Sequence, residues 1–279
     1  MRIHRRGSAA ALALCLGALT ACGGSPGEGQ AQGAQPPTAR PTAPAGADRA
    51  NEGPAAGQAV SLRGKVIVLD PGHNGGNGEH PAAINKKVDI GNGTKECDTT
   101  GTATNAGYNE HAFTWDVSTR LAKLLRAEGA KVVLTRKNDT GVGPCIDERA
   151  AIGNRAKADA ALSVHADGAS ASAHGFHIIQ PVAVKGHNAK MVPDAQRLGR
   201  ELRDAYRDGT GIAYSTYRGK KALDPRSDLG GLNLSTVPKV FIECGNMRNA
   251  SDAAKLSSAA FRQRIAVALA DGFEAYFRG

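Results

Sequence analysis

Four side chains in this sequence have the chemistry of a catalytic metal site: His73, Glu110, His165 and Glu243. Two imidazoles and one carboxylate suit a zinc ion that keeps one coordination position open, and His73, Glu110 and His165 supply that set. Zinc lowers the pKa of a bound water from near 16 to about 7. A second carboxylate must then take the proton and pass it on, and we expect Glu243 to do so.

Three of these side chains, His73, His165 and Glu243, stand at or just after the ends of predicted strands. The strands are the apolar runs at residues 65–70, 160–165 and 237–243. Ligand crevices in open α/β sheets form outside the carboxyl ends of the strands. Glu110 opens the helix that follows the first strand, so it should lie beside the same edge. The spacing therefore predicts one shared site.

Each residue also has an ordinary structural interpretation. A histidine at the end of a strand is usually a polar residue with satisfied hydrogen bonds. Glu110 is an acid in the first turn of a helix, where the helix dipole favours it. Glu243 could cap a neighbouring element. Residue types and spacing alone leave both the metal site and these structural roles open.

The order of the predicted elements indicates an α/β fold. Further strands are expected at residues 131–135 and 175–181. Helices are expected at residues 110–128, 147–157, 194–207 and 260–277. Strands that alternate with helices predict a mainly parallel sheet with helices on both faces. Residues 60–279, about 220 in number, suit a single domain of this kind.

The first 59 residues are predicted to stay outside that domain. Residues 1–21 join Arg2, Arg5 and Arg6 to a short apolar stretch, as a secretory signal does. A buried N-terminal helix is the alternative. Residues 22–59 are rich in Gly, Pro and Ala without apolar periodicity, so we expect a disordered tether.

The charge of the chain indicates which classes of molecule it can bind. The formal net charge is +9, and it falls to +6 without the three arginines of the signal. A moderate positive charge suits an anionic envelope polymer, and also ordinary solubility. No basic run with interleaved aromatics occurs, so we expect no nucleic-acid partner. No long heptad pattern occurs either, which favours a monomer.

Three of the five cysteines lie in the predicted domain. Cys97 and Cys145 stand in polar, loop-like sequence, whereas Cys244 closes an apolar strand. For an exported protein we therefore predict a Cys97–Cys145 disulfide. Its loop of about 49 residues would be worth roughly 4 kcal/mol in the chain-entropy account. Three reduced thiols are the alternative.

Five segments follow one another in the chain: VIVLDPGHNGG, Asn109-Glu110, Thr135-Arg136, ERAAIGNRAKADAALSVHAD and VPKVFIECGNMRN. Together they resemble the zinc-dependent N-acetylmuramoyl-L-alanine amidases of bacterial cell walls, amidase type 3, over residues 65–277. The resemblance implies that His73, Glu110 and His165 bind one zinc ion and that Glu243 is the catalytic carboxylate. It also implies a twisted, mostly parallel sheet of about six strands flanked by helices.

The implied reaction is hydrolysis of the amide between the lactyl group of N-acetylmuramic acid and the L-alanine of the stem peptide in peptidoglycan, in wall remodelling or turnover. Arg149 and Asn154 match the pattern as residues that support packing and the ligands. Leu232 and Asn246 are candidates for substrate contacts. A zinc peptidase that cuts within stem peptides and a wall-binding lipoprotein without turnover are the competing functions.

The segment Leu19-Thr20-Ala21-Cys22 resembles the lipobox of bacterial lipoproteins, in which the cysteine is lipidated. This implies an exported protein with a lipid anchor at Cys22, at the outer face of the cytoplasmic membrane. Ordinary signal cleavage is the alternative.

The chain departs from the family pattern in two places. Residues 76–107, between His73 and Glu110, form a longer insert than usual. Asn92-Gly93 predicts a tight hairpin there, and a Cys97–Cys145 bridge would hold it near the cleft. We expect the insert to narrow access or contact substrate; a neutral surface insertion is the alternative. Residues 181–233 show no room for a helical plug, so we expect activity without an activator.

Overall fold

The computed structural model describes residues 61–279. The predicted signal at residues 1–21, the tether at 22–59 and the lipidation site Cys22 lie outside the described residues. These three stay predictions from the sequence. The described part contains every candidate residue for metal binding and catalysis.

Six strands form the main sheet in the order β4-β1-β5-β8-β6-β7. They are β1 (Val66–Pro71), β4 (Lys131–Leu134), β5 (Ala160–Asp167), β6 (His177–Pro181), β7 (Leu223–Arg226) and β8 (Lys239–Asn246). Strands β4, β1, β5 and β8 are parallel, whereas β6 runs antiparallel to β8 and parallel to β7. The prediction of a single α/β domain with a mostly parallel sheet is confirmed.

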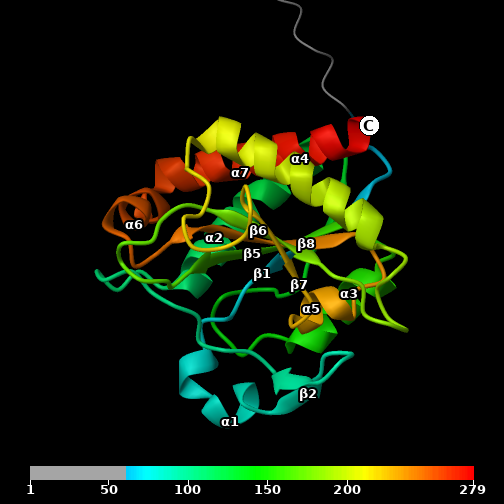
Figure 1. The fold of residues 1–279 in the computed structure, drawn as a ribbon, viewed down its shortest axis with the longest axis horizontal. Coiled ribbons are helices and arrows are strands. Elements are labelled where there is room, and N and C mark those ends of the chain that lie inside the picture. The colour runs from blue at the N-terminus through cyan, green and yellow to red at the C-terminus, as the bar shows by residue number, and fades with distance from the viewer. Residues whose placement is uncertain (1–60) are drawn as a thin grey trace, which may run out of the picture. The chain divides into compact units, whose positions relative to one another are not determined.

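Helices cover both faces of this sheet, as predicted. They are α2 (Glu110–Ala127), α3 (Ile146–Arg155), α4 (Val192–Thr210), α5 (Gly230–Asn233), α6 (Ala250–Ser257) and α7 (Ala259–Arg278). Figure 1 shows α4 and α7 side by side over one face, with α3 and α5 on the opposite face. Within residues 61–279, no helix is long and apolar enough to span a membrane.

Residues 66–69, the first four of β1, are apolar because both faces of the strand are buried. Ile67 and Leu69 lie in the larger core, and Val68 lies in the smaller core on the other face. Successive strand side chains point to opposite faces, so a strand buried on both faces needs an apolar residue at each of these four positions. Helix α2 adds Phe113 and Leu121 to the larger core from one stripe of its surface.

The structure contains short elements that the sequence did not predict. Strand β7 lies at the edge of the sheet and contains Pro225, which a central strand would not tolerate. Helices α5 and α6 span one or two turns and carry no extended apolar stripe. Strands β5 and β8 also continue past His165 and Glu243, to Asp167 and Asn246.

The insert forms a small subdomain of η1 (Asn77–Glu79), α1 (Pro81–Ile84), β2 (Lys87–Asp89) and β3 (Thr94–Glu96). Strands β2 and β3 pair as an antiparallel hairpin, as predicted. The turn residues are Gly91-Asn92 rather than Asn92-Gly93, because the N–H of Ile90 donates to the carbonyl of Gly93 over 2.9 Å. Gly91 takes the positive φ of +83° that this turn requires.

Candidate metal centre and active site

His73, Glu110 and His165 present one donor atom each within 4.8 Å of one another. They come from the loop after β1, the first residue of α2 and strand β5. Nε2 of His73 lies 3.3 Å from Oε1 of Glu110, and Nδ1 of His165 lies 2.9 Å from the same oxygen. The structure therefore brings the three predicted ligands together at one edge of the sheet.

Local backbone geometry positions the two imidazoles. His73 adopts a positive φ of 59°, which is strained for a residue with a side chain. A Cβ added at Gly72 would lie 2.0 Å from Cε1 of His165, so only glycine lets the chain pass this ring directly after β1. On its other side, the ring of His165 stacks on Phe241 at 3.9 Å between centroids. The site thus holds His165 between backbone and an aromatic ring.

Glu110 is held by hydrogen bonds at both of its carboxylate oxygens. Oε2 accepts from the backbone N–H of Thr102 over 2.8 Å, and Oε1 accepts from the N–H of Ala166 over 3.2 Å. Burial opposes the charge, but the charges of His73 and His165 and their hydrogen bonds to the carboxylate hold the pKa of Glu110 well below its usual range. Glu110 is therefore an anion with a fixed orientation, as a metal ligand must be.

The second ring nitrogen of His73 faces two acceptors. Nδ1 lies 3.1 Å from Oδ1 of Asp98 and 3.0 Å from the carbonyl oxygen of Thr99. Nδ1 therefore carries a proton in either charge state of the ring, and Nε2 faces Glu110. Burial alone would lower the pKa of His73, but the carboxylates of Glu110 and Asp98 raise it to about 10. Burial lowers the pKa of His165.

Asp98 is a residue that the sequence analysis missed. It stands 25 positions after His73, in a polar insert without strand or helix periodicity. Its place directly after Cys97 was the only available signal. The predicted Cys97–Cys145 disulfide is present, and Cys244 is a buried free thiol.

Glu243 lies beside the three candidate ligands. It is the register partner of His165 across the parallel pair β5–β8. Its Oε2 is buried and has no hydrogen-bond partner among the described residues. Burial, together with the nearby carboxylates of Glu110 and Asp167, raises the pKa of Glu243 well above its usual range. A buried carboxylate oxygen without a partner marks a place where a ligand, water or ion belongs.

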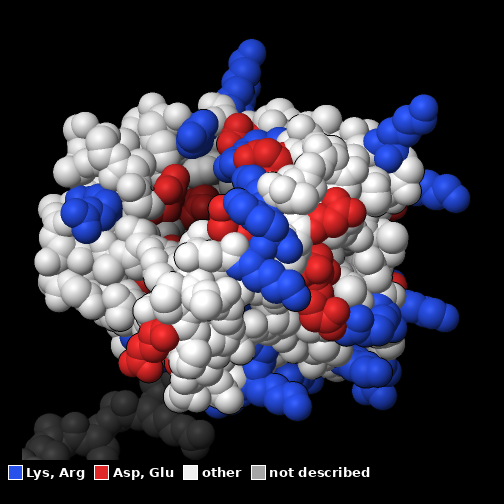
Figure 2. All heavy atoms as spheres, turned by 90° about the horizontal axis from the view of Figure 1, so that it is seen from below, with Lys and Arg blue, Asp and Glu red and all other residues white. Residues whose placement is uncertain are grey.

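A cavity of about 260 Å³ opens beside the candidate ligands. It is lined by Asp70, Gly72, His73, Lys95, Glu96, Asp98, Thr99, Ile146, Arg149, Ser163, His165, Leu229, Gly230, Gly231, Lys239 and Phe241. A second hollow shares His73 and His165 with it and adds Glu110 and Glu243. Figure 2 shows a hollow in the surface with acidic side chains inside it and lysines and arginines along one side.

The inner end of this cavity is a buried ionic network around Asp70. Oδ2 accepts from Nζ of Lys239 and the hydroxyl of Ser163, each over 2.9 Å. Oδ1 accepts from Arg149 over 2.9 Å and from the hydroxyl of Thr135 over 2.7 Å. Burial opposes the charge of Asp70, but Lys239 and Arg149 hold its pKa well below the usual range. The network fixes the end of β1, which leads into His73.

Arg149 and Asn154 support the structure, as expected from the sequence. Arg149 donates to the carbonyls of Pro71, over 2.7 Å, and His73, over 3.1 Å. Asn154 donates to the carbonyl of Leu234 over 2.9 Å and so ties α3 to the segment before β8.

The structure offers neither Leu232 nor Asn246 to a substrate. Both are 0% exposed. The side chain of Leu232 is part of the interior, and the amide of Asn246 donates to the carbonyls of Ser170 and Ala173 over 2.8 and 2.7 Å. Asn246 therefore fastens the loop after β5, and these two expectations are corrected.

Fold and site together define a class: a six-stranded α/β domain whose candidate metal centre combines two histidines and a glutamate. Residues 67–275 match the family described as N-acetylmuramoyl-L-alanine amidase, and the chain belongs to this family. The resemblance drawn from the sequence is confirmed.

Individual relatives agree with the family match. The N-acetylmuramoyl-L-alanine amidase Rv3717 of Mycobacterium tuberculosis is 42% identical over 214 residues, which cover 76% of this chain and 86% of that protein. The crystal structure of the amidase Ami1 from Mycobacterium smegmatis has 40% identity and a TM-score of 0.73, covering 78% of this chain and 99% of that one. Ami1 from Mycobacterium abscessus, in its apo form, has 42% identity and a TM-score of 0.71, covering 77% and 100%.

Proposed function

We propose that this chain is a zinc-dependent amidase that hydrolyses the bond between the lactyl group of N-acetylmuramic acid and the L-alanine of the stem peptide in peptidoglycan. One observation carries the proposal: the donors of His73, Glu110 and His165 lie within 4.8 Å of one another beside the unpartnered Oε2 of Glu243. Membership in the amidase family supports the substrate class.

The three donors fit zinc in kind and in number. His73 would bind through Nε2 and His165 through Nδ1, because these are the ring nitrogens that face Glu110. Two imidazoles and a carboxylate that open onto a cavity match a catalytic zinc site rather than a closed structural one. When bound, zinc would polarise the scissile carbonyl and make the attacking water more acidic.

Glu243 is proposed as the general base and then the general acid. Its buried carboxylate accepts a proton from the attacking water and delivers it to the departing nitrogen of alanine. The raised pKa supports this role, because a base that holds its proton too weakly cannot return it to the leaving group. The charge of a nearby metal ion would lower this pKa.

The insert is proposed to shape access to the cleft. Lys95 and Glu96 on β3 form part of the cavity wall. Contacts with the segment between β7 and α5 hold the hairpin across the cavity. The side chain of Asn92, in the hairpin turn, donates to the carbonyl of Ser227 in that segment over 2.7 Å. Nζ of Lys95 also lies 3.0 Å from Oδ2 of Asp228. The insert therefore forms a wall of the proposed substrate site.

Export and lipid anchoring at Cys22 are proposed from the signal-like N-terminus and the lipobox pattern. The Cys97–Cys145 disulfide supports export, because disulfides persist in oxidising compartments. We also propose a monomer that works without an activator. Mass spectrometry of the protein from membranes, beside a Cys22→Ser variant, tests the anchor through the mass of its N-terminal peptide.

The decisive experiment combines metal analysis with mass spectrometry of digested peptidoglycan. The parent chain should carry about one zinc ion and release intact stem peptides from lactyl-bearing glycan. Glu243→Gln should keep the zinc but slow hydrolysis by about 10²- to 10⁴-fold. Peptides cut internally would instead indicate a peptidase, and zinc binding without any product would indicate a wall-binding protein. A Glu243→Gln variant that hydrolyses at the parent rate overturns the assignment.

A further inference from the structure

We propose that Asp98 is a positioning residue for His73, and that the Cys97–Cys145 disulfide holds Asp98 in place for this task. The inference rests on the proposed metal site, because it concerns how one ligand of that site is oriented. It gives the insert a role at the metal centre in addition to its place in the cavity wall.

Both carboxylate oxygens of Asp98 are engaged, and its side chain is only 7% exposed. Oδ1 lies 3.1 Å from Nδ1 of His73 and accepts from the backbone N–H of Thr99 over 2.7 Å. Oδ2 accepts from a guanidinium nitrogen of Arg149 over 3.2 Å. Asp98 therefore has one orientation, and that orientation presents an oxygen to the ring of His73.

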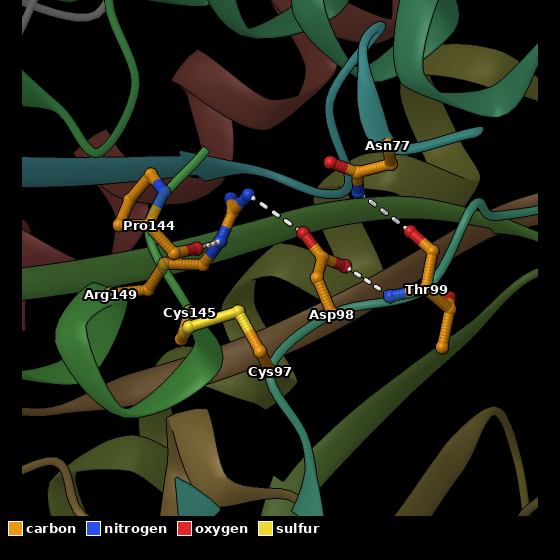
Figure 3. The surroundings of a disulfide bond; sticks show 7 residues. All are labelled: Asn77, Cys97, Asp98, Thr99, Pro144, Cys145 and Arg149. Carbon is orange, nitrogen blue, oxygen red and sulfur yellow. Dashed lines mark hydrogen bonds and ion pairs between the residues drawn. A yellow bond between two sulfur atoms is a disulfide. The ribbon is translucent and has the colours of Figure 1, made fainter. Parts of the chain in front are cut away.

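The disulfide joins this carboxylate to the helix that carries its arginine partner. Cys97 directly precedes Asp98, and Cys145 is the residue before α3. The N–H of Ile146 donates to the carbonyl of Cys97 over 2.9 Å, and the N–H of Arg149 donates to that of Cys145 over 2.9 Å. Figure 3 shows the bridge, Asp98 and Arg149 side by side.

Arg149 completes the connection to the metal site. The nitrogen that donates to Asp98 also donates to the backbone carbonyl of His73, over 3.1 Å. Asp98 thus contacts the ring of His73, and Arg149 binds its backbone carbonyl. Of these two residues only Asp98 belongs to the insert, and the disulfide is the covalent link that holds Asp98 in place.

A carboxylate at the second nitrogen of a ligand histidine fixes the tautomer and increases the basicity of the metal-binding nitrogen. Losing such a partner typically weakens metal binding by about 10- to 100-fold. Thr99 offers His73 a second, uncharged acceptor in its backbone carbonyl, which also accepts from Asn77 over 2.7 Å. Removing the charge of Asp98 should therefore weaken the site without releasing the ring completely.

The test measures zinc affinity on the full chain, by competition with a chromophoric chelator. Four variants are compared with the parent: Asp98→Asn, Cys97→Ser with Cys145→Ser, the triple variant, and Glu79→Gln as a control. Glu79 is an exposed acid of the same insert, and its side chain has no hydrogen-bond partner among residues 61–279. Unfolding curves recorded in parallel show that each variant is folded.

We expect Asp98→Asn to weaken zinc binding about 10-fold or more, and the double serine variant to weaken it as well. The triple variant should bind zinc no more weakly than Asp98→Asn, because the disulfide acts on the metal site through that carboxylate. Glu79→Gln should bind zinc like the parent. A disulfide that only stabilises the fold would lower the unfolding midpoint and leave zinc affinity unchanged.

Parent-like zinc affinity in Asp98→Asn overturns the inference, and so do losses that multiply in the triple variant. If the serine variants do not fold, Asp98→Asn with the disulfide intact decides the result alone. A parent chain that binds no zinc overturns the proposed function and this inference with it. A parent that binds zinc and cleaves peptidoglycan, beside an unaffected Asp98→Asn, overturns this inference only.

Discussion

His165 and Glu243 are register partners on the neighbouring parallel strands β5 and β8. Phe241, two residues before Glu243, stacks on the ring of His165, so these side chains share one face of the sheet. The candidate ligand and the proposed proton carrier are therefore positioned by backbone hydrogen bonds at the centre of the sheet. Rigid elements of this kind hold catalytic groups more accurately than loops do.

Gly72→Ala should weaken metal binding. The added methyl group would lie 2.0 Å from Cε1 and 2.2 Å from Nε2 of His165, so the ring must move. We expect zinc affinity to fall by about 10-fold or more, with a loss of about 1–3 kcal/mol in stability from overpacking. Gly78→Ala is the matched control, since nothing lies within 4 Å of its added carbon. Zinc bound equally well by both variants would contradict the prediction.

Asp70→Asn should destabilise the fold strongly. It leaves the buried charge of Lys239 without its carboxylate and removes one of the two carboxylates that pair with Arg149, and breaking a buried ion pair typically costs about 3–5 kcal/mol. Urea unfolding at pH 7 measures the loss. The lowered pKa of Asp70 means that its contribution is present above about pH 4 and is lost as the pH falls further. The stability of the variant should therefore fall less than that of the parent when the pH is lowered below about 4.

A control for Asp70→Asn comes from an exposed ion pair. Glu96→Gln breaks the contact with Lys87 on the surface of the hairpin, where water already solvates both groups. Its urea midpoint should stay close to that of the parent. If Asp70→Asn is no more destabilising than Glu96→Gln, the buried network does not anchor the end of β1.

Glu128→Gln should stabilise the chain at alkaline pH. Burial at the end of α2, with Glu274 and Asp271 of α7 nearby, raises the pKa of Glu128 to about 7. A carboxyl whose pKa is raised in the folded state contributes stability at low pH, and that contribution disappears as the pH rises through 7. Glutamine imitates the protonated form. We therefore expect a Tm about 1–3 °C above the parent at pH 8 and none of this gain at pH 4.5, measured by thermal unfolding.

Lys95→Ala should weaken substrate binding without affecting the metal. Lys95 lines the cavity, and its ammonium group is partly exposed beside Asp228. Losing one such charged contact should raise KM for a soluble muropeptide about two- to fivefold, with kcat and zinc affinity unchanged. Lys86→Ala removes the same charge from an exposed position outside the cavity wall and should leave KM unchanged. Equal KM values in the two variants would favour the insert as a neutral surface feature.

The sequence by itself determined the candidate ligands and the fold class. His73, His165 and Glu243 could be found because each stands near the end of an apolar run, and parallel strands bring their carboxyl ends to one edge. The Cys97–Cys145 pair could be found because both residues stand in polar sequence. These signals are local, so a single chain displays them without knowledge of its contacts.

Features that depend on contacts between distant segments of the chain were decided only by the tertiary structure. Asp98 reaches His73 from a polar insert, where no periodicity predicts the approach of one loop to another. The antiparallel direction of β6 and the burial of Leu232 and Asn246 follow from packing, which the residue types alone leave open. The sequence thus named the candidate metal ligands, and the folded chain decided which neighbours hold them in position.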